Sequence, residues 1–163
     1  MSELFHDRYT AHVDGEFAVL LIGMRINRPW LVHRWWPVFS AMSAMLNELA
    51  EHPEKGLLGA HRCLIGGPAV VQYWRSYEHL ERFARAGDDL HMPAWTRWNR
   101  AIRDTRAVGI WHETYVMRGG DHEAIYVSMP RFGLAAATAH VPVAHRGESS
   151  RERIRAGSVS SSG

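Results

Sequence analysis

The chain has 163 residues and a formal net charge of +2 at pH 7, a size at which one domain can bury a core without disulfides or structural metals. Its single cysteine, Cys63, excludes an internal disulfide and fits a reducing compartment. The first residues, MSELFHDRY, lack an apolar signal core, and no run is long enough to cross a bilayer. We therefore expect a cytoplasmic protein with no membrane partner.

The positive charge is concentrated near the C-terminal end. From His145 onward four arginines face two glutamates, which leaves residues 1–144 near neutral. A domain that is nearly neutral lacks the basic surface with which proteins bind the phosphates of nucleic acids, so no nucleic-acid partner is expected. Because the end segment has no aromatic residue and no sustained apolar period, residues 145–163 are predicted to form a disordered basic tail. Residues 1–144 are predicted to form a single domain.

In chain order, the domain first shows a strand, a helix and a hairpin. The run FAVLLIGMRI from residue 17 predicts the strand. Apolar residues at helical spacing between Pro29 and Pro53 predict the helix, and Pro37 should kink it or delay its regular part. The runs LLGAHRCLI from residue 57 and AVVQYWRS from residue 69 predict two strands, which the glycines of GGP join as a hairpin.

Two helices and two strands follow. Ser76 can cap a helix that buries Leu80 and Phe83. A further helix is expected to carry four residues on one stripe, at steps of four, three and four: His91, Trp95, Trp98 and Ile102. The run GIWHETYVM from residue 109 predicts a strand, and AIYVSMP from residue 124 predicts a last strand that pairs with it. The glycines of the intervening RGGD can take φ > 0, as a tight hairpin requires.

This element order predicts an α+β fold of the ferredoxin-like type, with an antiparallel sheet and helices on one face. The other face of the sheet is expected to be apolar as well, because both sets of alternating residues are apolar in the strand that contains Val19 to Ile22. An exposed apolar face of that size marks an interaction surface. The simplest partner is a second copy of the chain, so we expect a homodimer.

Four stretches resemble, in chain order, the signatures of a bacterial and fungal family related to the monooxygenase of fumagillin biosynthesis: YWRSYEHLERFA, HMPAWTRWNR, GIWHETY and IYVSMPRFGL. The resemblance runs from about Phe17 to Leu134. That family, long described as a domain of unknown function, belongs to the dimeric α+β barrel superfamily. The resemblance implies a pocket between the sheet and the helices of each subunit. The superfamily includes cofactor-free monooxygenases that act on polyketide-like aromatics, haem degraders, chlorite dismutases and aldoxime dehydratases, so the fold does not select the reaction.

His91 is the first candidate for chemistry. It shares its predicted stripe with two indoles, and in the haem-binding relatives an axial histidine comes from a helix in about this region. The resemblance thus implies His91 as a haem ligand, although the sequence contains no CxxCH motif. The alternative is a histidine that caps the helix or bonds to a neighbouring strand.

His112 and Glu113 are the next candidates. Adjacent strand residues face opposite ways, so the two cannot share one site directly. If His112 lies on the helix side, its imidazole suits a base that removes a proton from a phenol or enol, and this role and a structural one are equally supported. Glu113 would then lie at the subunit interface, paired with an arginine such as Arg25 or Arg75, and this ion pair is favoured over a catalytic role.

Other motifs point away from metals and nucleotides. Val116 stands where the zinc-protease motif HExxH needs its second histidine. The spacing of His61, His91 and Glu113 does not single out an iron site with two histidines and one carboxylate. The sequence lacks a P-loop and a GxGxxG after a strand. No metal site is therefore predicted.

The chain contains seven tryptophans, which is many for its length and suits a pocket for a flat hydrophobic ligand. A core role is the alternative for these aromatic residues. Cys63 is either a small buried residue or a thiolate ligand for haem. The residues expected to line the pocket are Trp35, Met42, Tyr73, Trp95 and Trp98.

These patterns predict a homodimeric, monooxygenase-like oxidoreductase that acts on a hydrophobic small molecule, with His112 and His91 as catalytic candidates. A cofactor-free oxygenase takes its electrons from the substrate, so a base such as His112 would produce the carbanion that meets dioxygen. The first alternative is a haem enzyme of the same fold, resembling aldoxime dehydratase, with His91 as axial ligand. The second is a ligand-binding barrel without catalysis.

Overall fold

Four strands form the main sheet of the computed structural model, which describes residues 3–85 and 106–160. Their order across the sheet is β3-β4-β2-β5, and every neighbouring pair is antiparallel. This order is that of a ferredoxin-like split βαβ unit and confirms the predicted α+β fold. The strands are β2 (Glu16–Ile26), β3 (Leu57–Leu64), β4 (Pro68–Trp74) and β5 (Val108–Arg118).

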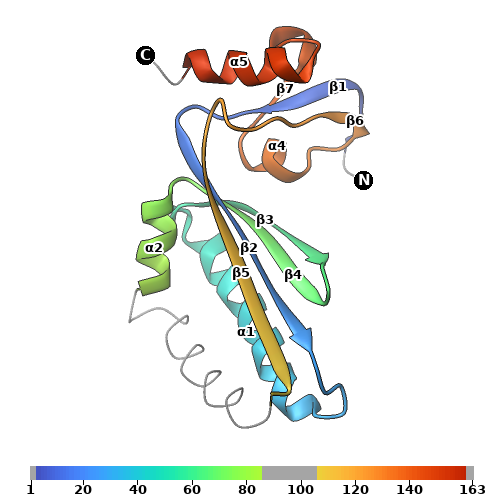
Figure 1. Ribbon diagram of the computed structural model, residues 1–163, viewed down its shortest axis with the longest axis vertical. Helices are drawn as coiled ribbons and strands as arrows, with labels where there is room; N and C mark the ends of the chain where they lie inside the picture. The colour runs from blue at the N-terminus through green and yellow to red at the C-terminus, as the bar shows by residue number, and fades with distance from the viewer. Residues whose placement is uncertain (1–2, 86–105, 161–163) are drawn as a thin grey trace.

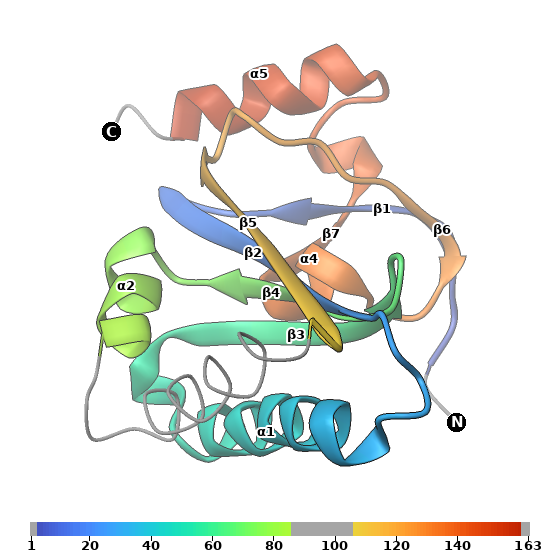
Figure 2. The same ribbon diagram turned by 60° about the horizontal axis from the view of Figure 1, so that its bottom comes forward.

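Two helices, α1 (Val32–Glu51) and α2 (Tyr77–Arg85), lie on one face of this sheet (Figures 1 and 2). The 3₁₀ turn η1 (Pro53–Lys55) follows α1, and α1 continues through Pro37. The hydroxyl oxygen of Ser76 accepts the backbone N–H of His79 at 3.4 Å, as a capping residue does. The helix predicted around His91 to Ile102 lies outside the described residues. No helix in the described ranges is both long and apolar enough to span a bilayer.

A second sheet, with the order β6-β1-β7, lies on the other side of the main sheet (Figure 2). Its strands are β1 (Phe5–His12), β6 (Tyr126–Met129) and β7 (Ala139–Pro142), accompanied by α4 (Gly133–Ala137), the 3₁₀ turn η2 (Val143–His145) and α5 (Ser150–Ser160). A core cluster of Ala11, Val13, Phe17, Leu134 and Ala135 joins it to the main sheet, with Tyr73 packed against the cluster. The chain therefore covers one end of its own second sheet face, whereas the sequence pattern predicts a partner subunit there.

The predicted hairpin between β5 and β6 is wrong, because β6 pairs with β1. Gly119 and Gly120 are not among the described glycines with positive φ. They serve close packing instead: a side chain on Gly120 would collide with Ser158, and one on Gly157 with the carbonyl oxygen of Gly119. Helix α5 thus lies directly on this turn. By contrast, Gly66 and Gly67 have φ of 65° and 149° and join β3 to β4 as predicted.

The expected disordered tail is also corrected, since Ser150–Ser160 forms α5. The sequence Ser149-x-x-Glu152 makes a capping box: the Glu152 carboxylate accepts the Ser149 N–H at 2.9 Å, and the Ser149 hydroxyl accepts the Glu152 N–H at 3.3 Å. These hydrogen bonds to Ser149 hold the pKa of Glu152 below its usual value. The polar composition of the segment concealed this start signal.

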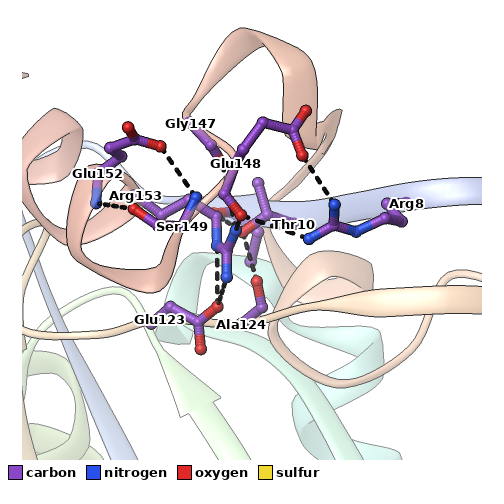
Figure 3. Close-up of polar contacts among 10 residues, drawn as sticks. Arg8, Thr10, Glu123, Ala124, Gly147, Glu148, Ser149, Glu152 and Arg153 are labelled. Atoms are coloured by element: carbon purple, nitrogen blue, oxygen red, sulfur yellow. Dashed lines mark hydrogen bonds and ion pairs between the residues drawn. The ribbon is translucent and has the colours of Figure 1, made fainter.

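Arg153 attaches α5 to the body of the protein (Figure 3). The residue is only 8 % exposed. Its Nε donates to the carboxylate of Glu123 at 2.8 Å, and its Nη1 donates to the carbonyl oxygens of Gly147 and Glu148 at 3.1 and 2.9 Å. Glu148 in turn accepts from Arg8 of β1 at 2.7 Å. A buried arginine whose donors are satisfied in this way is a structural anchor.

We expect Arg153→Met to lower the free energy of unfolding by about 2 kcal/mol, because the Glu123 carboxylate loses its partner. Arg155→Met is the matched control, since Arg155 is exposed on the same helix, and its effect should stay within about 0.5 kcal/mol. Urea unfolding followed by circular dichroism measures both. Equal stability of the two variants would contradict the anchoring role.

Candidate functional site

A cavity of about 810 Å³ lies between α1 and the main sheet. Its floor includes Leu20, Ile22 and Met24 of β2 together with Val70 of β4, and Ile110 of β5 borders it. The lining is mainly apolar, as is usual for sites that bind small hydrophobic ligands. The family resemblance noted in the sequence implies a pocket in this position, between the sheet and the helices.

The small side chains in the middle of α1 explain why this space is open. Towards the end of α1, Met45 and Leu49 pack into a core cluster with Ala18 and Trp74. Near its start, Leu31, Trp35 and Val38 pack around Met24 and Val108. Between these clusters the helix presents Ser40, Ala41, Ser43 and Ala44, which line the cavity. Side chains of this size leave room that larger residues would fill.

One amide and two guanidinium groups are among the polar groups that border the cavity. Gln72 lies on its sheet side and is only 5 % exposed. Arg34 and Arg62 also line the cavity, and neither has an ion-pair partner within the described part of the chain. The arginines are more exposed than Gln72, so solvent screens their charge. The best shielded polar group at the cavity is therefore a neutral amide.

The predicted pocket residues fall in three places. Met42 lines the cavity. Trp35 belongs to the cluster at one end of it and donates its indole N–H to the Pro29 carbonyl oxygen at 3.0 Å. Tyr73 lies on the opposite face of the sheet, which corrects its assignment to the pocket, because Gln72 and Trp74 take the alternate positions that face α1. Trp95, Trp98 and His91 lie outside the described residues.

His112 is on the helix-facing side of β5. It pairs with Ile22 across the strands, and Ile110, two residues before it, faces the same way. Both isoleucines line the cavity, whereas His112 itself is exposed and not part of the lining. The imidazole thus lies next to the part of the cavity border that β5 forms. A role as a base requires His112 to be on this face of the strand.

Glu113 lies on the other face, as alternation requires, and within the described residues it has no arginine partner. Its carboxylate accepts the hydroxyl proton of Tyr115 at 2.7 Å. This hydrogen bond and the negative charge of Glu113 raise the pKa of Tyr115. Both residues are exposed on an edge strand, so a carboxylate there does not need a cationic partner.

The second face of the sheet carries phenol groups close to α4. The Tyr126 hydroxyl accepts the backbone N–H of Ala135, a residue of α4, at 3.3 Å. Nearby, the ring of His61 packs against the ring of Phe132, with centroids 4.5 Å apart. Burial raises the pKa of both Tyr73 and Tyr126, and for Tyr73 the nearby Tyr126 adds to the shift. These phenols fill the junction of the two sheets and have no access to the cavity below α1.

The donor set of the cavity does not fit a haem held by histidine within the described residues. Its sulfur donors are the thiol of Cys63 and the thioethers of Met24, Met42 and Met45, and no imidazole is among the described lining residues. The described ranges also contain no cluster of three or more histidine, cysteine, aspartate or glutamate residues arranged for a metal ion. Any imidazole ligand from His91 would come from outside these ranges.

Gln72, Ser43 and Arg62 were not among the residues predicted from the sequence. Gln72 was nevertheless signalled by its position, because AVVQYW places it between Val70 and Trp74 on one strand face. A lone polar residue in an otherwise apolar, buried register position indicates either a structural hydrogen bond or a ligand contact.

The fold and the cavity define the chain as a ferredoxin-like α+β protein with a pocket between sheet and helix. A family model described as Monooxygenase af470-like matches residues 17–134, more than half of the chain. The chain belongs to this monooxygenase af470-like family, which confirms the resemblance seen in the sequence. Every described residue that lines the cavity lies inside the matched range.

Monooxygenase af470 of Aspergillus fumigatus is 25 % identical over 149 residues, which cover 78 % of this chain and 53 % of that protein. The chain thus spans about half the length of this relative. Two solved structures of aldoxime dehydratase, one of them in complex with butyraldoxime, each match with a TM-score of 0.65. Their identities are 16 % and 15 %, over 85 % and 86 % of this chain and 44 % and 45 % of theirs. They share the fold.

Proposed function

We propose that the chain binds a hydrophobic small molecule in the cavity under α1 and oxidises it as a monooxygenase-like enzyme. The observation that carries this proposal is the apolar cavity of about 810 Å³, whose described lining residues all lie within the range that matches the monooxygenase family. A volume of this order is typical of sites for small organic ligands. The apolar walls favour a substrate that itself offers mainly apolar surface.

The simplest chemistry needs no bound cofactor. A base removes a proton from an activated CH₂ group, and the carbanion forms a C–O bond with dioxygen to give a hydroperoxide. The O–O bond then breaks as the second C–H proton is lost, which leaves a carbonyl group and releases one water. The carbon loses four electrons and dioxygen gains four, so the substrate is the only reductant. One oxygen atom of O₂ enters the product.

His112 is the proposed base, because it adjoins the cavity on the helix-facing side of β5. An imidazole can accept the first proton and return one to the departing oxygen. Its exposure leaves a route for the proton to solvent. The neighbouring Ile22 and Ile110 would hold the apolar part of the substrate against the sheet.

A haem enzyme with His91 as axial ligand stays a second prediction from the family resemblance. The aldoxime dehydratase structures support it only at the level of the fold. Because the described lining residues offer no imidazole, nothing in the described part of the chain favours it over the cofactor-free scheme.

A homodimer is part of the proposal, because part of the second sheet face lacks a cover from the described residues of the chain itself. Trp111 lies there across Gly23, where a side chain on Gly23 would come within 2.8 Å of the indole. Tyr115 is 48 % exposed on the same face. Aromatic residues grouped on an open sheet face are typical of a subunit interface.

Anthrone, a flat tricyclic ketone with an activated CH₂, is the probe for turnover. With ¹⁸O₂, the protein should accelerate formation of anthraquinone that carries one ¹⁸O atom, as mass spectrometry detects. Ser43→Phe should abolish the acceleration, because the ring fills the cavity, whereas Asn47→Phe on the exposed side of α1 should retain it. Binding of anthrone without oxidation above the protein-free rate would favour a non-catalytic barrel.

His112→Ala should lower kcat by about 100-fold or more while the dissociation constant for anthrone changes little, because a base acts in the transition state. Stopped-flow absorbance and tryptophan quenching measure the two quantities separately. Thr114→Ala, two residues along the same face, is the control. Unchanged turnover in His112→Ala would remove the base assignment.

Light scattering should give about twice the chain mass of 18.6 kDa at micromolar concentration. Tyr115→Arg should shift the protein towards monomer, because it places a charge in the proposed interface. Thr114→Arg adds the same charge on the opposite face of the strand and should leave the dimer intact. A monomeric wild-type protein would refute the dimer.

A further inference from the structure

The geometry of Gln72 points to a requirement on the ligand: we propose that the molecule bound under α1 carries a neutral hydrogen-bond acceptor, a ketone-type oxygen, that Gln72 Nε2 engages. This inference rests on the proposed function in one respect, since it uses the same cavity. It adds the chemical group that the site recognises and the residue that recognises it.

Trp74 fixes the orientation of the Gln72 amide. The indole N–H of Trp74, a residue with 0 % exposure, donates to Gln72 Oε1 at 3.0 Å. An indole nitrogen can only donate, so the amide oxygen has to face Trp74. The amide NH₂ group is thereby directed away from Trp74, and Gln72 lines the cavity.

The Nε2 group has no acceptor in the described part of the chain. Only 5 % of the Gln72 surface is exposed, and the side chains around it in the cavity are mainly apolar. Nε2 is not among the fully buried atoms that lack a partner, so it is accessible from the cavity. A ligand that covers this donor without offering an acceptor leaves it unpaired, at a cost in free energy that a hydrogen bond to the ligand avoids. A purely apolar ligand would leave the donor unpaired, whereas a ligand with a carbonyl oxygen would satisfy it.

The acceptor is expected to be neutral. An amide dipole compensates poorly for the burial of a full negative charge. The two arginines that border the cavity are exposed enough to be screened by water, so they do not supply that compensation at the position of Gln72. Ketones and quinones combine a neutral acceptor with a flat apolar body, which matches both parts of the site.

A matched ligand pair tests the inference with the full chain. 2-Acetylnaphthalene and 2-ethylnaphthalene have almost the same shape and differ in one carbonyl group. Calorimetry should show that Gln72→Leu weakens binding of the acetyl compound by about three- to tenfold, the usual effect of one hydrogen bond. Binding of the ethyl compound should stay within about twofold. Asn47→Leu, which removes an exposed amide from α1, should change neither affinity.

Trp74→Phe gives a second, independent readout. Without the indole N–H the amide can rotate, so the preference for the acetyl compound should fall even though Gln72 is present. Infrared spectra of wild-type protein with ¹³C-carbonyl acetylnaphthalene need no variant and should show the carbonyl band shifted to lower frequency than in an apolar solvent. Melting curves establish that each variant is folded.

The outcomes separate this inference from the proposed function. Equal losses for both ligands in Gln72→Leu, or an unshifted carbonyl band, would overturn the acceptor requirement and leave the cavity as a binding site. Failure of both ligands to bind the wild-type protein would overturn the cavity site and this inference with it. Selective loss of affinity for the acetyl compound, together with the shifted band, supports the cavity as the binding site and the acceptor requirement; oxidation is tested separately with anthrone.

Discussion

The arrangement of the protein depends on the burial of both faces of strand β2. Phe17 and Ala18 are neighbours in the chain, point to opposite faces, and are 1 % and 0 % exposed. A strand in this situation needs an apolar layer on each side. Helices α1 and α2 supply one layer, and the small sheet with α4 supplies part of the other. Where the second layer ends, Trp111 and Tyr115 remain on an open face.

The elements that the sequence predicted well are those specified by local signals. The glycines between β3 and β4 adopt positive φ, and Ser76 caps α2, because a turn or a cap is decided within a few residues. The partner of β6 could not be predicted in this way. Its neighbour is β1, more than 100 residues earlier in the chain, and no local pattern in GGD distinguishes a hairpin from a crossing to another sheet.

Prediction of the site shows the same division. Alternation along β5 determined that His112 and Glu113 lie on opposite faces, and helical spacing placed Met42 towards the sheet. Tyr73 was assigned to the wrong face because both faces of β4 carry large apolar residues, so the pattern alone had no preferred register. Gln72 was overlooked since its role depends on Trp74, and such a pair is visible only once the strand is packed.

The position of β1 has a consequence for how the chain folds as it is synthesised. This strand comes from the first residues yet pairs on one side with β6 and on the other with β7, which ends at Pro142 (Figure 1). The ferredoxin-like unit can assemble once β5 has left the ribosome, whereas the small sheet waits until β6 and β7 have followed. Late, long-range pairing of this kind is slow compared with local contacts. Until it completes, β1 is a free strand and Phe17 lacks its cover, so the nascent protein passes through a stage in which the segment from β1 to the start of β2 is the one most in need of protection.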